Sequence, residues 1–120
     1  MIGVYAPGGR NYPHVDCYGL VKHYYKNFHG VEILDFDYID PDERENTKYF
    51  HQQMNSDNWI KVNPQEGAVV ALMVNGIVSH CGFMKSKNDF VHIMKDCGES
   101  RVKITNPKWK NRIVGYYLYA

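Results

Sequence analysis

The dipeptide Asn75-Gly76 limits the folds open to this chain more than any other feature, because it joins two short apolar segments. Asn-Gly adopts the left-handed backbone that a tight hairpin turn requires. Residues 68–74 before it are rich in β-branched side chains, and residues 77–85 return as a second strand. Further strands are predicted at residues 90–95, 101–105 and 112–119. The second half of the chain therefore predicts an antiparallel meander of about five strands.

The first half of the chain contains two helix starts. Asp16 is a preferred N-cap, apolar residues follow it at helical spacing, and Gly30 provides a left-handed stop. A second helix is predicted from Asp40, its cap, to about Met54, and Glu43 completes a capping box. This second helix is strongly polar, which is typical of a helix on the surface.

Helices followed by strands indicate an α+β domain, in which the N-terminal helices pack on the antiparallel sheet. The 120 residues are enough for one core, so we expect a single domain over residues 1–120. Residues 5–13 carry two prolines and a Gly-Gly pair and predict a loop. Residues 59–62 are interpreted as a connection that leads to the turn at Asn63-Pro64.

Charge and composition exclude several kinds of partner. The formal net charge is +1, which gives no electrostatic case for binding nucleic acid. No run of about 18 apolar residues is present, so membrane insertion is not expected. Residues 1–4 are too short for the apolar segment of a signal peptide. Three cysteines at wide spacing favour free thiols over a disulfide framework.

Cys17 follows the N-cap directly, where free N–H groups and the helix dipole favour the thiolate form. His80 and His92 lie in the middle of two neighbouring predicted strands, although histidine is not a preferred strand residue. We expect Cys17 to act as the nucleophile, His80 to take and return the proton, and His92 to orient the His80 ring. The alternative is that both histidines only pack in the core or at an edge.

This assignment places a condition on the turn between the two strands. Side chains alternate between the faces of a strand, so His80 and His92 must share a face if one orients the other. A hairpin loop with an even number of residues would place His92 opposite Phe83, on the wrong face. We therefore predict an odd-length loop or a one-residue bulge between Gly82 and His92, with the two rings in hydrogen-bond reach.

Zinc binding is the competing chemistry. His80, Cys81, His92 and Cys97 are suitable ligand types, but His80 and Cys81 are adjacent on a strand and point to opposite faces. We therefore expect no metal and no other cofactor. Cys81 is expected to face the core as a small apolar residue, and Cys97 to lie in a turn. The remaining histidines, expected at the surface, are His14, His23, His29 and His51, of which His14 is near enough to Cys17 to touch a substrate.

Taken together, these residues resemble a known family. Tyr5, Gly8-Gly9 and Asp16-Cys17 are similar to the N-terminal motif of the NlpC-type, papain-like cell-wall peptidases. Downstream, residues 64–70, the segment His80-Cys81-Gly82, and His92 resemble the family's later strands. The resemblance covers essentially the whole chain. It implies a papain-like NlpC-type fold and a cysteine peptidase with a Cys-His-His triad.

The family's substrate is an amide bond in peptidoglycan stem peptides, which the resemblance implies here too. It also implies that the Tyr5 hydroxyl lies beside the Cys17 thiol and helps hold the oxyanion, and we expect Asp16, Tyr12 and Tyr18 to contact the substrate. The chain departs from the family at Ala68, where an aspartate is usual, and at Cys81, where a valine is usual. We expect no catalytic consequence from the cysteine.

Residues 16–21 together with residues 30–34 are similar to the phage tail-tip branch of this family. That likeness implies a component of the virion tail tip, made in the host cytoplasm, with other tail-tip proteins as partners. Because the chain begins at the motif tyrosine, another protein is expected to complete the N-terminal side of the groove. Two alternatives remain, namely a structural tail-assembly protein with dispensable activity and a cellular amidase or acyltransferase on the same scaffold.

Overall fold

The computed structural model describes residues 2–36 and 43–120, and these ranges confirm the predicted α+β class. The elements are β1 (Val4–Tyr5), β2 (Arg10–Asn11), β3 (His14–Val15), α1 (Cys17–His29), α2 (Glu43–Met54), β4 (Trp59–Val62), β5 (Val69–Val74), β6 (Ile77–Met84), β7 (Asp89–Met94), β8 (Gly98–Lys103), the 3₁₀ turn η1 (Lys110–Arg112) and β9 (Ile113–Tyr119). The second helix ends at Met54 as predicted, and its predicted cap, Asp40, lies outside the described residues. Neither of these helices is long and apolar enough to span a membrane.

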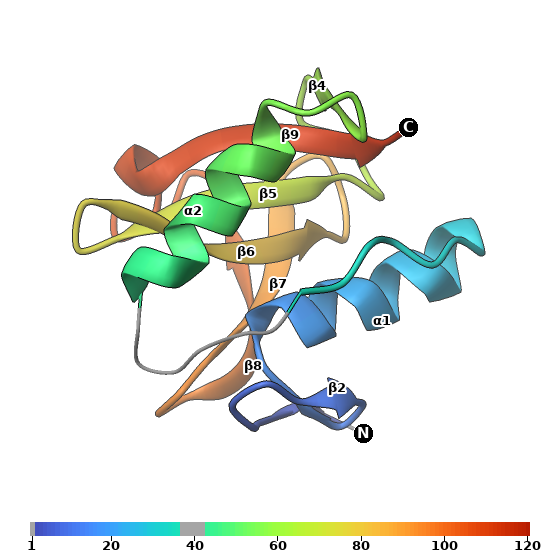
Figure 1. The fold of residues 1–120 in the computed structure, drawn as a ribbon. Coiled ribbons are helices and arrows are strands. Elements are labelled where there is room, and N and C mark those ends of the chain that lie inside the picture. Colours follow the sequence, from blue (N-terminus) through green and yellow to red (C-terminus); the bar gives the residue numbers. More distant parts are fainter. Residues whose placement is uncertain (1, 37–42) are drawn as a thin grey trace.

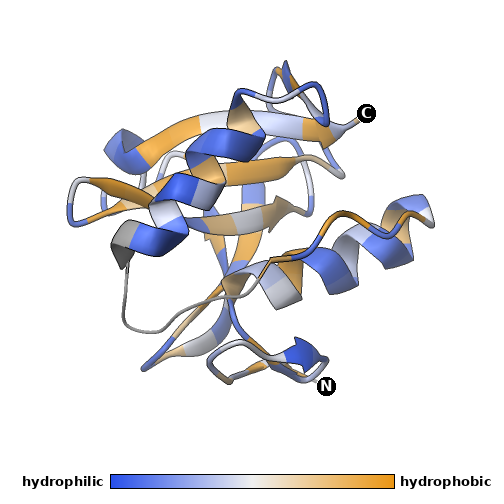
Figure 2. Ribbon diagram, viewed as in Figure 1, coloured by the Kyte–Doolittle hydropathy of each residue, from blue (hydrophilic) through white to orange (hydrophobic). Residues whose placement is uncertain are grey.

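Both helices pack on one face of a six-stranded sheet, in the strand order β4-β9-β5-β6-β7-β8 (Figure 1). Apolar residues run along much of β5, whereas α2 is largely hydrophilic toward solvent (Figure 2). Two buried clusters form the core. The cluster between helices and sheet includes Leu20, Val21, Tyr25, Phe50, Val69, Phe83 and Ile93. The cluster on the opposite face is Ala68, Val70, Leu72, Met84, Phe90 and Trp109.

The main sheet has six strands, one more than the five that the sequence analysis named. Residues 59–62 form β4, which pairs antiparallel with β9 from Trp59–Tyr119 to Val62–Tyr116. The Trp59 ring packs edge-on against Tyr119, with 4.9 Å between ring centroids. Aromatic cross-strand pairs stabilise such an edge strand. The segment has only four residues, two of which face solvent, so its alternation of apolar and polar residues was too short to predict a strand.

The loop predicted at residues 5–13 includes the short strand β2 and meets β1 and β3 at its two ends, and the three form a small sheet in the order β1-β3-β2. We call residues 2–15, which include this sheet, the N-terminal arm. Glu99 on β8 fastens the arm, because its carboxylate accepts hydrogen bonds from the Gly3 N–H, the Tyr12 hydroxyl and the Tyr24 hydroxyl. The arm thereby brings Tyr5, which pairs with Val15, alongside the start of α1.

Helix α1 begins and ends as the sequence predicts. The Asp16 carboxylate accepts a hydrogen bond from the Gly19 N–H at 2.7 Å, and Gly30 ends the helix at φ +73°. The first turn lies directly against the arm, since a Cβ on Gly19 would lie 2.1 Å from the carbonyl oxygen of Gly9. This close approach explains why position 19 is glycine, and a Cβ on Gly9 would lie 2.4 Å from the carbonyl oxygen of His14.

The hairpin between β6 and β7 has the predicted odd-length loop. The Lys85 N–H donates to the Asp89 carbonyl, which leaves the three residues 86–88 in the loop. The strands then pair at Phe83–Val91 and Met84–Phe90. In this register His92 lies opposite Gly82, on the same face as His80, and Val91 turns to the other face. The predicted condition for the two histidines is therefore confirmed.

Candidate active site

Cys17 opens helix α1 and is almost fully buried, with 3% of its surface exposed. Cys17 shares a buried cluster with Cys81 of β6, and Cys81 and His80 are the residues that most affect the titration of its thiol. Helix α1 and strand β6 therefore bring the Cys17 sulfur and the His80 imidazole together from distant parts of the sequence.

The surroundings of Cys17 favour its thiolate form. The hydrogen bond with the Cys81 thiol does most to lower the pKa of Cys17, and burial opposes this effect. The hydrogen bond and charge of His80 lower the pKa further, as does the Cys81 N–H. The result is a pKa well below that of an ordinary thiol, at the positive end of the α1 dipole.

His80 and His92 form a buried pair behind the sulfur. The His80 Nε2 and the His92 Nδ1 lie 2.9 Å apart, and the two residues are 5% and 2% exposed. Burial, followed by the charges of His80 and Lys108, lowers the pKa of His92 to about 3, so His92 is neutral near pH 7. We therefore assign the proton between the rings to His80, whose Nε2–H donates to the His92 Nδ1.

This tautomer leaves the Nδ1 of His80 as the ring nitrogen available to Cys17. The order of groups is then thiol, imidazole, imidazole, as a nucleophile with a base and an orienting group requires. Trp109 packs edge-on against the His92 ring, at 4.9 Å between centroids, and excludes water from that side. Within the described ranges, no group of three or more His, Cys, Asp or Glu side chains is arranged to hold a metal ion.

Because His92 is buried, we expect the free energy of unfolding to fall in acid. Unfolded, His92 takes up a proton near pH 6.5, whereas folded it does so only near pH 3. The unfolded chain thus binds more protons between these values, and stability is lost as the pH falls through that window. Urea unfolding at about pH 7 and about pH 5 should show a smaller loss of unfolding free energy for His92→Gln than for the original chain. His51→Gln, at an exposed histidine, is the control, and equal losses in all three proteins would contradict the prediction.

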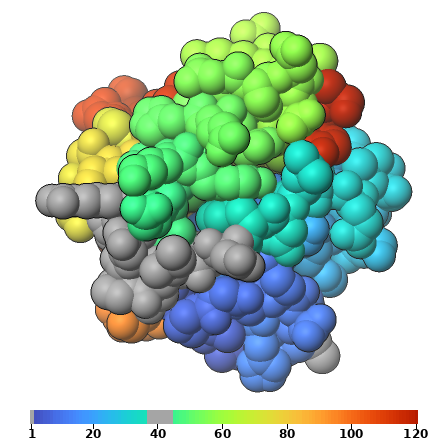
Figure 3. Space-filling model, in the orientation of Figure 1, coloured from blue at the N-terminus to red at the C-terminus, as the bar shows by residue number. Residues whose placement is uncertain are grey.

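Arg10 is part of the site and was not found from the sequence. Its guanidinium bonds the Asp16 carboxylate at 2.7 Å, the Asp35 carboxylate at 2.8 Å and the Phe36 carbonyl at 2.9 Å. Burial alone would lower the pKa of Arg10, but these two carboxylates raise it, so the cation is retained. Residues 31–36 thereby lie between the arm and α2 (Figure 3). The sequence did contain a signal for the pairing of Arg10 with Asp16. Arg10 is the one charged residue among residues 5–13, and a capping aspartate buried in a core needs a cation.

The three residues expected to contact the substrate all have structural partners. Asp16 is completely buried. Its Oδ1 accepts hydrogen bonds from the Arg10 guanidinium and the Gly19 N–H, while its Oδ2 has no hydrogen-bond partner in the described part of the chain. The Tyr18 hydroxyl donates to the Leu34 carbonyl. Tyr12 stacks on His23 at 3.9 Å between ring centroids, in addition to its bond with Glu99. Their contacts with substrate stay predictions.

Tyr5 is half-buried and packs against the core cluster that contains Cys17. Its predicted role, donation of a hydroxyl to the developing oxyanion, leads to an expected result. Tyr5→Phe should lower kcat/KM about tenfold to a hundredfold, with an unchanged melting temperature. Tyr116→Phe is the same change on the opposite face of the sheet, where Tyr116 packs. Full activity in Tyr5→Phe would leave Tyr5 with a packing role alone.

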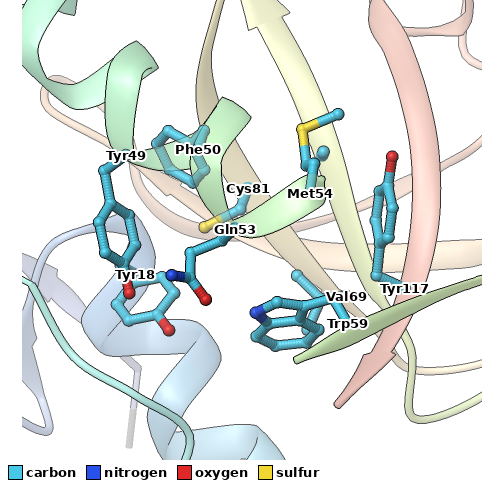
Figure 4. A pocket seen from close by; sticks show the side chains of 10 residues that line it. Tyr18, Tyr49, Phe50, Gln53, Met54, Trp59, Val69, Cys81 and Tyr117 are labelled. Atoms are coloured by element: carbon cyan, nitrogen blue, oxygen red, sulfur yellow. The ribbon is translucent and has the colours of Figure 1, made fainter. Parts of the chain in front are cut away.

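An apolar pocket adjoins the site on the helix side of the sheet. The Cys81 sulfur points toward this space between α2 and the strands, and the Tyr18 ring closes one end (Figure 4). Its lining residues are Tyr18, Tyr49, Phe50, Gln53, Met54, Trp59, Val69, Ala71, Cys81 and Tyr117.

The remaining cysteines and histidines do not belong to the Cys17-His80-His92 row. Cys97 is exposed in the turn before β8, as predicted, and Cys81 faces the core, also as predicted. His14 and His51 are exposed. His29 bonds the Gly67 carbonyl at 2.7 Å, so it fastens the end of α1 to the start of β5.

An α+β domain with a thiol, an imidazole and a second imidazole in a row is the arrangement of a cysteine hydrolase. The model of the NlpC/P60 family matches residues 3–117, and the chain therefore belongs to the NlpC/P60 family. The fold is similar to the crystal structure of the NlpC/p60 domain of the peptidoglycan hydrolase SagA, at 14% identity and a TM-score of 0.61. That likeness covers 99% of this chain and 89% of the SagA domain and confirms the papain-like NlpC-type fold. No curated protein matches the chain.

Proposed function

We propose that this protein is a cysteine peptidase that hydrolyses an amide bond in peptidoglycan stem peptides. The observation that carries the proposal is the 2.9 Å hydrogen bond between His80 and His92 behind the Cys17 sulfur. A packing role needs neither a buried polar pair nor a thiolate beside it, because buried polar groups cost stability unless they are satisfied. Membership of the NlpC/P60 family supports the choice of substrate.

The reaction follows from the positions of these groups. The Cys17 thiolate attacks the amide carbonyl, and the C–O double bond opens to an oxyanion held by backbone N–H groups at the start of α1 and by the Tyr5 hydroxyl. The C–N bond then breaks, and the leaving amine takes the proton from the His80 Nδ1. The product is a thioester on Cys17.

Water completes the cycle. The neutral His80 removes a proton from a water molecule as the water oxygen attacks the thioester. The C–S bond breaks, the carboxylic acid leaves, and the thiolate and the protonated His80 are restored. The neutral His92 accepts from His80 at every stage, so it keeps the ring in one orientation and does not compete for the proton.

Digestion of purified peptidoglycan tests the proposal. Fragments released by the original chain should carry a new free amine and a new carboxyl within the stem peptide, which mass analysis locates. Cys17→Ser and an inert control with Cys97→Ser, at the exposed cysteine, separate catalysis from contamination. Absence of new termini with the original chain, or their presence with Cys17→Ser, would contradict the proposal.

We further propose that the chain acts as part of a phage tail tip and opens the cell wall during entry. The support is the pattern of residues 16–21 and 30–34, in which an aromatic residue follows the cysteine and a Gly-hydrophobic-Glu segment follows the first helix. Intact Cys17, His80 and His92 favour an active peptidase over a structural tail part. Proteomic analysis of purified phage particles that carry this gene should find the chain in the tail fraction, and its absence there would contradict the assignment.

A further inference from the structure

Strand β7 carries His92 just beyond the point where β6 and β7 stop pairing. Among the described residues, the pair of these strands nearest to His92 is Phe83–Val91. On its other side β7 pairs with β8 along its whole length, and His92 lies opposite Ser100. Strands β7 and β8 extend away from β6 toward the N-terminal arm (Figure 1). The position of His92 therefore depends on what holds the hairpin of β7 and β8.

Glu99, on β8, joins this hairpin to two other elements. Its Oε1 accepts hydrogen bonds from the Gly3 N–H and the Tyr12 hydroxyl, each at 2.7 Å. The Glu99 N–H in turn donates to the Gly3 carbonyl at 3.2 Å. Its Oε2 accepts from the Tyr24 hydroxyl. One carboxylate oxygen thus binds the N-terminal arm, and the other binds helix α1.

The Glu99 carboxylate keeps its charge near neutral pH. Burial alone would raise the pKa of Glu99, but the hydrogen bonds from Tyr24, Tyr12 and Gly3 lower it below its ordinary value. Hydrogen bonds to an ionised acceptor are roughly twice as strong as those between neutral groups. The carboxylate therefore holds the hairpin against α1 and the arm more firmly than a neutral side chain would.

We infer that Glu99 is a positioning residue for the Cys17-His80-His92 row, because it holds the hairpin that carries His92 against the helix that begins with Cys17. This inference rests on the proposed function, in which His92 orients His80. The 2.9 Å bond between the two rings crosses from β6 to β7 where, among the described residues, these strands are not paired. A displacement of about 1 Å at a catalytic group can lower a rate about a hundredfold.

Three substitutions separate the link to α1 from the link to the arm. Tyr24→Phe removes the hydroxyl bound to Oε2, leaves the bonds to Oε1, and keeps the ring that stacks on Phe83 at 5.8 Å between centroids. Glu99→Ala removes the side-chain bonds to both elements. Asp96→Ala is the matched control, because Asp96 is an exposed carboxylate in the turn between β7 and β8.

The first measurement is kcat and KM for release of stem-peptide fragments. Tyr24→Phe should lower kcat about threefold and Glu99→Ala about tenfold, with KM nearly unchanged, while Asp96→Ala should have no effect. When His92 is already replaced by alanine, Tyr24→Phe should lower kcat no further, since no ring is left to position. Its effect on the melting temperature should persist in both backgrounds.

The second measurement does not need turnover. In protein with isotope-labelled histidines, the NMR chemical shifts of the ring nitrogens report the hydrogen bond between the His80 Nε2 and the His92 Nδ1. Glu99→Ala and Tyr24→Phe should move these signals, and Asp96→Ala should leave them in place. Thermal melting establishes that each variant is folded. If Glu99→Ala does not fold, Glu99→Gln, which keeps one acceptor oxygen, takes its place with the same readings.

An unchanged kcat in Glu99→Ala would overturn the inference. Equal fold losses of kcat for Tyr24→Phe with and without the His92 ring would overturn it too, because a general loss of structure would then explain them. The outcome is separate from the proposed function. Shifted ring signals in a protein that releases no peptidoglycan fragments refute the peptidase, whereas cleavage with ring signals that stay in place refutes the role of Glu99.

Discussion

His80→Ala should lower the rate of amide hydrolysis about a thousandfold and leave the domain folded. The imidazole is the group that returns a proton to the leaving amine and takes one from water, so its removal affects both halves of the reaction. Its ring lies between Cys17 and His92, with Nε2 held at 2.9 Å from the His92 Nδ1. The measurement is the initial rate of release of stem-peptide fragments, with circular dichroism to show the fold.

His92→Ala should lower the rate less, about tenfold to a hundredfold, because His80 is the only reacting group that His92 contacts. His51→Ala, at an exposed histidine of α2, is the matched control and should retain full activity. A His80→Ala protein as active as the original chain would refute the mechanism. A larger loss with His92→Ala than with His80→Ala would reverse the roles assigned to the two rings.

Asp16→Ala should reduce the free energy of unfolding by about 3–5 kcal/mol. The carboxylate is completely buried, caps α1 through the Gly19 N–H and pairs with Arg10, whose side chain is 20% exposed. Its removal leaves Arg10 without its buried partner and α1 without its cap. Asp16→Asn keeps an oxygen for the cap and should lose less.

Asp35→Ala is the matched control for Asp16. Asp35 pairs with the same Arg10, but its side chain is 41% exposed, so the expected loss is about 1 kcal/mol or less. Urea unfolding near neutral pH measures all three variants. Equal losses for Asp16→Ala and Asp35→Ala would show that the buried pair has no special part in holding the arm to α1.

Local chemistry predicted the parts of this fold that depend on neighbouring residues. Asp16 and Gly30 bound α1 as expected, since caps act on groups within one turn. The odd-length loop at residues 86–88 followed from a single requirement, that two histidines share a face. The hypothesis of a catalytic histidine pair thus predicted the register of β6 and β7, which the turn residues alone did not determine.

The features that the sequence did not reveal join residues far apart in the chain. Glu99 binds Gly3 and Tyr12 from the opposite end of the sequence, and Arg10 binds Asp16 beneath the segment at Phe36. Side-chain pairing of this kind depends on tertiary packing and has no local period.

Competition between the three cysteines for iodoacetamide tests the central claim, an activated nucleophile at Cys17, most directly. Exposure and electrostatics make opposite predictions, because Cys97 is exposed whereas Cys17 is 3% exposed. The reaction is run near pH 7 with reagent below one equivalent, and peptide mass analysis gives the modified fraction of each cysteine. The lowered pKa of Cys17 predicts that Cys17 is alkylated first. Faster alkylation of Cys97 or Cys81 would contradict the account.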